Sequence, residues 1–121
     1  MKLEVGMYVR TLNGMIAKII SKKDVSGSLH REEIVYILDN GNRLALHSKK
    51  VVKSSHNIID LIEPEDYVNG VEVIDKEFDN FNEEYLQCGV GDYIICTYEV
   101  KDIKSIITKE KMEQMNYKVG E

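Results

Sequence analysis

Residues 5–19 read Val5-Gly6-Met7-Tyr8-Val9-Arg10-Thr11-Leu12-Asn13-Gly14-Met15-Ile16-Ala17-Lys18-Ile19, and this stretch decides the fold class. Both halves are rich in the β-branched and aromatic residues that favour strands. Between them stands Asn13-Gly14, a strong hairpin signal, because these residues accept the positive φ angles of a two-residue turn. The stretch therefore predicts a β-hairpin.

The same Asn-Gly turn signal occurs twice more, at Asn40-Gly41 and Asn69-Gly70. Each pair again separates apolar runs, which are residues 33–38 and 43–46 around the first pair and residues 67–68 and 71–74 around the second. Further runs of strand-favouring residues occupy positions 93–100 and 103–107. The sequence predicts a mainly β protein with at least three hairpins.

Signals for loops and helices are fewer. The polar segments 21–32 and 75–84 are expected to be loops. Thr108 is suited to cap a short helix over residues 109–115, and residues 54–61 are expected to form one helical turn. Pro64 follows that turn and is expected to separate two halves of the chain.

The order of hairpin, variable loop, second hairpin and helical turn resembles an SH3-like small barrel, and the opening Val5–Ile19 resembles that of KOW modules. Such a barrel suits short strands because closure leaves few unpaired edges. We expect one or two SH3-like barrels with one or two short helices.

An internal sequence repeat suggests a tandem duplication. Leu3-Glu4-Val5-Gly6-Met7-Tyr8-Val9 resembles Ile62-Glu63-Pro64-Glu65-Asp66-Tyr67-Val68, and each copy is followed by an Asn-Gly pair and a strand. Val51-Val52-Lys53-Ser54 likewise resembles Asp102-Ile103-Lys104-Ser105. The expected organisation is a β module at 1–61 and a second at 62–121 with a short C-terminal helix. One compact domain is the alternative.

The composition is that of a soluble globular protein. Of 121 residues, 43% are hydrophobic and 31% are charged, and no apolar run approaches the length of a membrane span. The first residues lack the pattern of a signal peptide, and two cysteines do not make a disulfide framework. A cytoplasmic location, here in a host cell, is expected.

Charge is distributed unevenly. Residues 1–61 carry ten Lys/Arg against six Asp/Glu, a balance of +4, whereas residues 62–121 carry six against fifteen, a balance of −9. Such a field favours a basic partner, although many acidic faces only keep a protein soluble. The predicted partner-binding residues are the acids of segment 63–84: Glu63, Glu65, Asp66, Glu72, Asp75, Glu77, Asp79, Glu83 and Glu84.

The first half offers an alternative, basic surface. Its residues are Lys18, Lys22, Lys23, Arg31, Lys49, Lys50 and Lys53, with Tyr8 and Tyr36 as aromatic neighbours. Basic side chains with aromatic ones suit a nucleotide or a nucleic acid. The alternative interpretation is a lysine-rich edge that prevents strand-to-strand aggregation.

Enzyme signatures are missing from the sequence. Gly89-Val90-Gly91 precedes a strand rather than a helix and lacks the pattern of a phosphate-binding loop. The three histidines have no metal-ligand spacing, and Cys88 and Cys96 are interpreted as small hydrophobic residues. We expect a non-enzymatic protein with no catalytic residue, metal or cofactor.

A resemblance to a group of known proteins narrows the choice of function. The opening 1–11, the segment Asn57-Ile58-Ile59-Asp60-Leu61-Ile62-Glu63 with Asp66-Tyr67-Val68-Asn69-Gly70, and the ending 102–110 with 117–121 resemble small uncharacterised phage and prophage accessory proteins of low-GC Gram-positive bacteria. Pro64-Glu65 departs from the Val-Gly expected there. The resemblance implies a phage accessory protein without assigned catalytic residues, and such proteins are often inhibitors of host defence.

Three functions follow as expectations. The first is an anti-CRISPR-like inhibitor that binds a nucleic-acid-binding host defence protein through its acidic surface. The second is a sponge that sequesters a nucleotide signal, and the third is a KOW-like module that binds nucleic acid or a transcription complex. No membrane partner is expected, and a homo-oligomer is compatible with each function.

Overall fold

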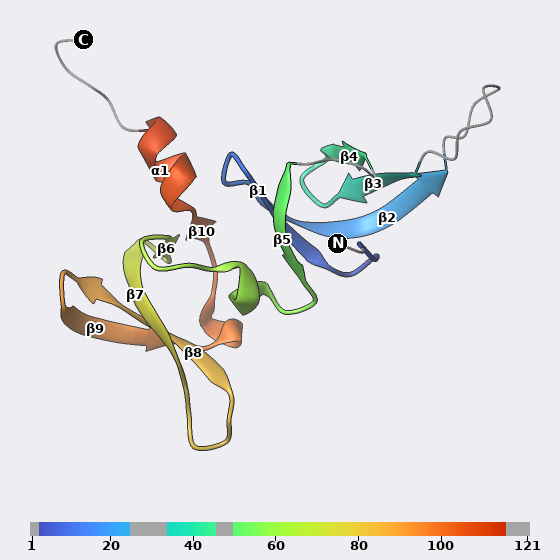
Figure 1. Cartoon of the computed structure of the whole chain (residues 1–121). Coiled ribbons are helices and arrows are strands. Elements are labelled where there is room, and N and C mark those ends of the chain that lie inside the picture. Colours follow the sequence, from blue (N-terminus) through green and yellow to red (C-terminus); the bar gives the residue numbers. More distant parts are fainter. Residues whose placement is uncertain (1–2, 25–33, 46–49, 116–121) are drawn as a thin grey trace, which may run out of the picture. The chain divides into compact units, whose positions relative to one another are not determined.

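The structure, a computed structural model, describes residues 3–24, 34–45 and 50–115. The chain divides into two compact units, Met1–Asn57 and Ile58–Glu121. Figure 1 labels the strands of both units and helix α1. The division falls four residues before the boundary expected from the sequence, which was placed between residues 61 and 62.

The first unit is an antiparallel sheet of five strands. They are β1 (Tyr8–Thr11), β2 (Ile16–Asp24), β3 (Ile34–Leu38), β4 (Arg43–Ala45) and β5 (Val51–Ser55), in the spatial order β4-β3-β2-β1-β5. Alternate residues of these strands point inward, so Val9, Ile19 and Leu38 form a fully buried core. Tyr36 joins that core, and its hydroxyl donates a hydrogen bond to the Leu3 carbonyl.

The second unit contains a second antiparallel sheet. Its elements are the 3-10 helix η1 (Ile58–Leu61), strands β6 (Tyr67–Val68), β7 (Val71–Phe78), β8 (Glu84–Val90) and β9 (Tyr93–Tyr98), the 3-10 helix η2 (Val100–Asp102), strand β10 (Ile106–Ile107) and helix α1 (Lys109–Met115). The spatial order is β10-β6-β7-β8-β9. Its core is Ile59, Ile62, Val68, Val73, Leu86 and Cys88.

The predicted mainly β class is confirmed, and all three Asn-Gly pairs lie in turns between paired strands. In both units the last strand pairs with the first, as the expected barrel requires. Among the described strands, however, β4 does not pair with β5 and β9 does not pair with β10, so neither sheet closes through hydrogen bonds into a complete barrel.

The two units repeat the same turn before their first strands. In the first, the Gly6 N–H donates to the Ile19 carbonyl at 2.8 Å, and the Ile19 N–H donates to the Met7 carbonyl at 2.8 Å. In the second, the Glu65 N–H donates to the Val73 carbonyl at 2.9 Å, and the Val73 N–H donates to the Asp66 carbonyl at 2.7 Å. Together with the shared strand order, this match supports the tandem duplication.

The repeated turn explains why Pro64-Glu65 departs from the expected sequence. Gly6 has a φ of 95°, and Glu65, at the equivalent position, has a φ of 77°. The left-handed region is costly for a residue with a Cβ and not for glycine. The second unit therefore carries local strain that the first avoids.

Glu65→Gly is expected to relieve this strain. The free energy of unfolding of the second unit should rise by about 1 kcal/mol, because the αL penalty exceeds the extra entropy that glycine loses on folding. Urea unfolding followed through signals of the second unit measures the change, with Glu77→Gly in mid-strand β7 as a control expected to destabilise. An unchanged or lower stability in Glu65→Gly would show that the turn is unstrained.

Two predicted loops are wrong. Segment 75–84 is the distal half of a long hairpin, since β7 continues to Phe78 and β8 begins at Glu84. Residues 21–24, assigned to a polar loop, belong to β2; the rest of that segment lies outside the described residues. The strand residues at 21–24 and 75–78 are mostly polar because they extend beyond the core, where strand pairing continues without a buried face.

The helical predictions are partly correct. Helix 109–115 is confirmed, and the Thr108 hydroxyl accepts a hydrogen bond from the Lys111 N–H. The turn predicted over 54–61 is only the 3-10 helix Ile58–Leu61, since residues 54 and 55 belong to β5. The strand predicted over 103–107 is reduced to Ile106–Ile107.

The repeat at the ends of the two copies is shifted by one residue. Ser54 pairs with Val9, and Ile106 pairs with Val68, so Ser54 corresponds to Ile106 rather than to Ser105. A one-residue shift reverses which face each side chain occupies. The two four-residue segments that resemble each other in sequence are therefore not structurally equivalent in that alignment.

Candidate functional site

One face of β7 carries a row of carboxylates. Val73 is buried opposite Cys88, and a register shift between Val73 and Asp75 inserts one residue. Because of this bulge, Glu72, Asp75 and Glu77 all point to the outer face of the sheet, although alternation alone would separate Glu72 from the other two. We call these three residues the acidic row; Asp75 and Glu77 are exposed and Glu72 is half-buried.

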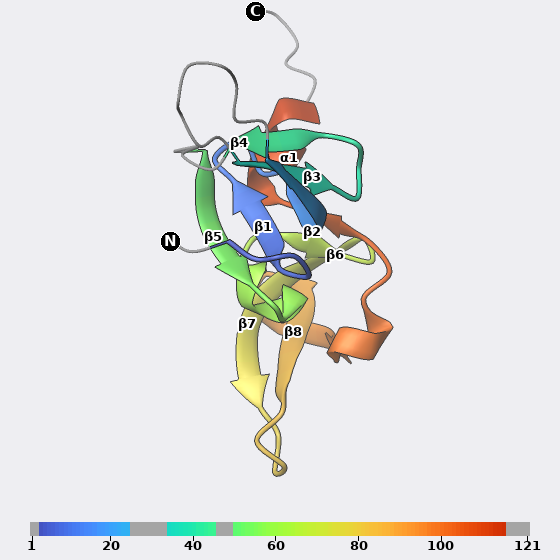
Figure 2. The ribbon, with the colours of Figure 1, turned by 90° about the vertical axis from the view of Figure 1, so that its right-hand side faces the viewer.

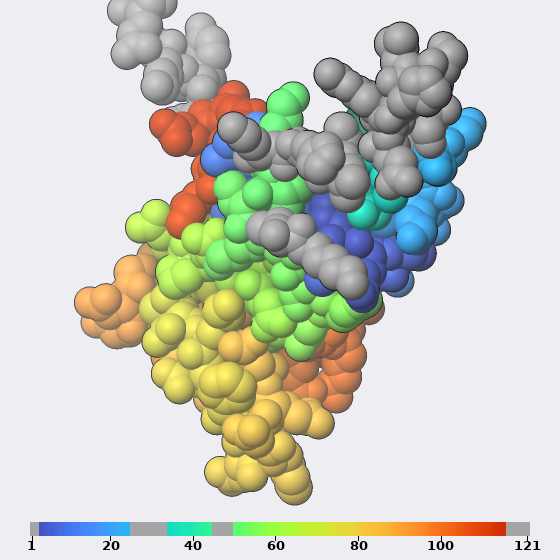
Figure 3. Space-filling view, turned by 45° about the vertical axis from the view of Figure 1, so that its right-hand side comes forward, coloured from blue at the N-terminus to red at the C-terminus, as the bar shows by residue number. Residues whose placement is uncertain are grey.

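Beyond the acidic row, the β7–β8 hairpin extends from its own unit as a narrow arm (Figures 2 and 3, yellow). Asp79 shapes its end, since Oδ1 accepts hydrogen bonds from the Phe81 N–H at 2.8 Å and the Glu83 N–H at 2.9 Å. Phe78 and Phe81 are 62% and 86% exposed at this end. The arm thus presents aromatic side chains among carboxylates on a well-defined turn.

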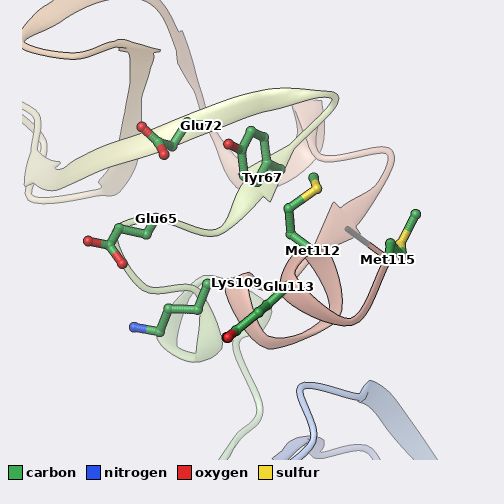
Figure 4. Close-up of a pocket in the computed structure, with 7 residues that line it drawn as sticks. All are labelled: Glu65, Tyr67, Glu72, Lys109, Met112, Glu113 and Met115. Atoms are coloured by element: carbon green, nitrogen blue, oxygen red, sulfur yellow. The ribbon is translucent and has the colours of Figure 1, made fainter. Parts of the chain in front are cut away.

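A pocket of about 650 Å³ opens where the acidic row begins. Tyr67 and Glu72 are cross-strand partners on β6 and β7, and α1 borders them. Figure 4 shows its lining residues: Glu65, Tyr67, Glu72, Lys109, Met112, Glu113 and Met115. The lining includes three carboxylates and one ammonium group, and that Lys109 ammonium is 3.4 Å from the Glu63 carboxylate.

Two of the predicted acidic residues have structural roles instead. Asp66 is fully buried, and its carboxylate accepts the Glu63 N–H at 2.7 Å and the Lys109 N–H at 2.9 Å. It fastens the turn before β6 to the start of α1. Glu63 is half-buried and paired with Lys109. Asp66 is therefore enclosed in the fold, whereas Glu63 stays partly exposed beside Lys109.

The remaining predicted acids fall into two groups. Glu65 and Glu72 line the pocket, with Asp75 and Glu77 continuing along the same strand. Asp79, Glu83 and Glu84 lie at the far end of the hairpin. Five lining residues were not predicted from the sequence: Tyr67, Lys109, Met112, Glu113 and Met115. The spacing of the two methionines on the predicted helix nevertheless places them on one side.

The described basic residues of the first unit do not all lie on one face of its sheet. Lys18 lies over the Tyr8 ring, with its ammonium 5.6 Å from the ring centre, and Lys22 and Lys23 are successive residues on β2 that face opposite sides. Lys50 is exposed and Lys53 is half-buried on β5, while Arg31 and Lys49 lie outside the described residues. Tyr36 is buried and is not available for stacking.

The cysteines meet across the sheet. Cys88 on β8 and Cys96 on β9 are direct cross-strand partners, and both are free thiols. Burial, and then the neighbouring Cys96, raise the pKa of Cys88 to about 11. The pKa of Tyr98 is also raised, chiefly because its side chain hydrogen-bonds Cys96.

No family model, curated protein or solved structure matches the chain. Within the described residues, no group of three or more His, Cys, Asp or Glu side chains is arranged to hold a metal ion. In the same residues, no helix has the length and apolar character that a membrane span requires. In the described part of the chain, the acidic row and its pocket gather carboxylates beside apolar side chains, a lining that is electrostatically complementary to a cationic group.

Proposed function

We propose that this protein is a non-enzymatic, phage-encoded inhibitor that binds a cationic surface of a nucleic-acid-binding host defence protein. The observation that carries the proposal is the acidic row, which places Glu72, Asp75 and Glu77 on one face of β7 beside an acidic pocket. Carboxylates repeated along an extended strand present a linear series of negative charges. A nucleic-acid channel, lined by Lys and Arg to contact phosphates, is complementary to such a series.

The pocket suits an arginine side chain of that partner. Glu65, Glu72 and Glu113 provide carboxylate oxygens, and guanidinium groups bind carboxylates through paired hydrogen bonds. Tyr67 offers an aromatic ring, and Met112 and Met115 provide apolar thioether surface for the aliphatic part of the side chain. An anionic ligand would meet three carboxylates there, which disfavours a nucleotide at this site.

The resemblance to phage accessory proteins supports the choice of a defence protein as target, and the net charge of −9 in residues 62–121 supports electrostatic steering toward it. The inhibitor would act by occupying the channel that the target uses for nucleic acid. No chemical step is needed, so inhibition should be stoichiometric and reversible.

Phage infection of hosts that carry a defined RNA-guided nuclease tests this function. Expression of the parent chain is expected to restore plaque formation by a targeted phage, and the purified chain is expected to reduce DNA cleavage by the purified nuclease. Added DNA should relieve inhibition, because both ligands compete for one channel. The proposal would be contradicted if the chain neither inhibited nor bound any nuclease in a panel of this kind.

A further inference from the structure

The two cysteines lie close enough to react with each other. Directly opposite residues of antiparallel strands have Cα atoms about 4.5–5.5 Å apart, inside the range of about 4.4–6.8 Å found in disulfides. Cys88 and Cys96 are such partners, and both side chains belong to the core side of the sheet. Both are reduced in this structure.

The surrounding backbone fixes this pair. A Cβ added at Gly89 would collide with the backbone carbonyl of Tyr93, so only glycine permits the close return of β9 along β8. The register shifts between Cys88 and Gly89, and the bulge lies immediately beside the pair. The strands are thus held together at the point where the two thiols face each other.

We propose that Cys88 and Cys96 form a reversible intramolecular disulfide when the chain meets a low-molecular-weight disulfide such as oxidised glutathione. Cys96 is only partly buried, whereas Cys88 is fully buried. The Cys96 thiolate attacks oxidised glutathione, forming a mixed disulfide and releasing one glutathione thiolate. The Cys88 thiolate then attacks the Cys96 sulfur, releasing the second glutathione. The two protein thiols are oxidised by two electrons, and one glutathione disulfide is reduced to two thiols.

The different environments of the thiols determine this order. The raised pKa of Cys88 keeps it protonated and inert toward an external reagent. Once Cys96 carries the mixed disulfide, its sulfur lies next to Cys88. The high effective concentration of the two sulfurs then compensates for the small thiolate fraction of Cys88. Because Cys88 and Cys96 lie on the core side, the bridge forms on the opposite side of the sheet from the acidic row, and this inference is independent of the proposed function.

The experiment equilibrates the reduced full-length chain with mixtures of reduced and oxidised glutathione, blocks free thiols after acid quenching and identifies products by mass spectrometry. A bridged monomer linking Cys88 and Cys96 is expected. The equilibrium constant for forming this disulfide in the folded chain should exceed the constant in the urea-unfolded chain by about tenfold or more, because native pairing pre-aligns the thiols. Predominant mixed disulfides or interchain dimers would overturn the proposal.

Matched variants locate the reaction. Cys88→Ser should stop at the Cys96 mixed disulfide, and Cys96→Ser should leave Cys88 unmodified. The double variant Cys96→Ser with Thr97→Cys moves the second thiol by one residue to the outer face of β9, where it cannot meet Cys88. Bridging in that variant as readily as in the parent would also overturn the proposal.

Discussion

Replacing Asp66 with alanine is expected to lower the free energy of unfolding of the second unit by about 3 kcal/mol. The Asp66 carboxylate is fully buried and accepts one N–H from the turn before β6 and one from the start of α1. Alanine removes both acceptors, which leaves the Glu63 and Lys109 N–H groups without this partner. Hydrogen bonds to charged acceptors are worth about 1.5–3 kcal/mol each, and the two losses are not fully additive.

Urea unfolding, followed through amide signals of the second unit, measures this effect. Asp66→Asn keeps one carbonyl oxygen and places an amide donor where the second was, so an intermediate loss is expected. Asp75→Ala is the matched control, because Asp75 is exposed and should change stability by no more than about 0.5 kcal/mol. If Asp66→Ala unfolds at the parent's urea concentration, the carboxylate does not fasten the turn to the helix.

Asp66 also shows where sequence reasoning succeeds and where it ends. Its position in the repeated segment correctly aligned Asp66 with Met7, since their carbonyls accept equivalent hydrogen bonds. Its residue type, however, placed it among the surface acids. Burial of a carboxylate depends on partners distant in sequence, here the N–H of Lys109, and no local pattern announces them.

The β7–β8 hairpin illustrates the complementary error. Turn residues such as Asn-Gly mark hairpins directly, which is why β1–β2, β3–β4 and β6–β7 were predicted. Segment 75–84 has neither that signal nor a continuous apolar face, so its polarity indicated a loop. Cross-strand pairing with β8 extends β7 to Phe78, so only residues 79–83 remain as the turn. The bulge between Val73 and Asp75, which creates the acidic row, likewise requires the register of both strands.

Reversing the acidic row, with Glu72, Asp75 and Glu77 all changed to lysine, is expected to weaken binding to the cationic target about a hundredfold. One exposed ion pair is worth about 0.2–1 kcal/mol, so any single change should barely register. The triple change removes three attractions and adds three repulsions, together about 3 kcal/mol, and about 1.4 kcal/mol corresponds to tenfold in Kd. The fold should persist, because two of the residues are exposed and Glu72 is half-buried.

An oligo-arginine peptide provides a binding probe before the target is identified, with an oligo-glutamate peptide as its counterpart. Titration of the parent with oligo-arginine should shift the methyl signals of Met112 and Met115, which line the pocket, and the oligo-glutamate peptide should not. Association should slow as salt rises, because screening weakens electrostatic steering.

The matched control for the triple reversal is Asp24→Lys, Asp60→Lys and Asp92→Lys. It changes the net charge by the same amount, from −5 to +1, without touching the acidic row. If binding depends on net charge alone, both triple variants lose affinity equally, and the acidic row is then only a solvated surface. If only substitutions of Lys18, Lys22 or Lys50 reduce inhibition, the active surface lies in the first unit. If only the acidic-row variant loses affinity, binding depends on the ordered carboxylates of β7 themselves, because the two variants have the same net charge and differ only in the positions of the charges.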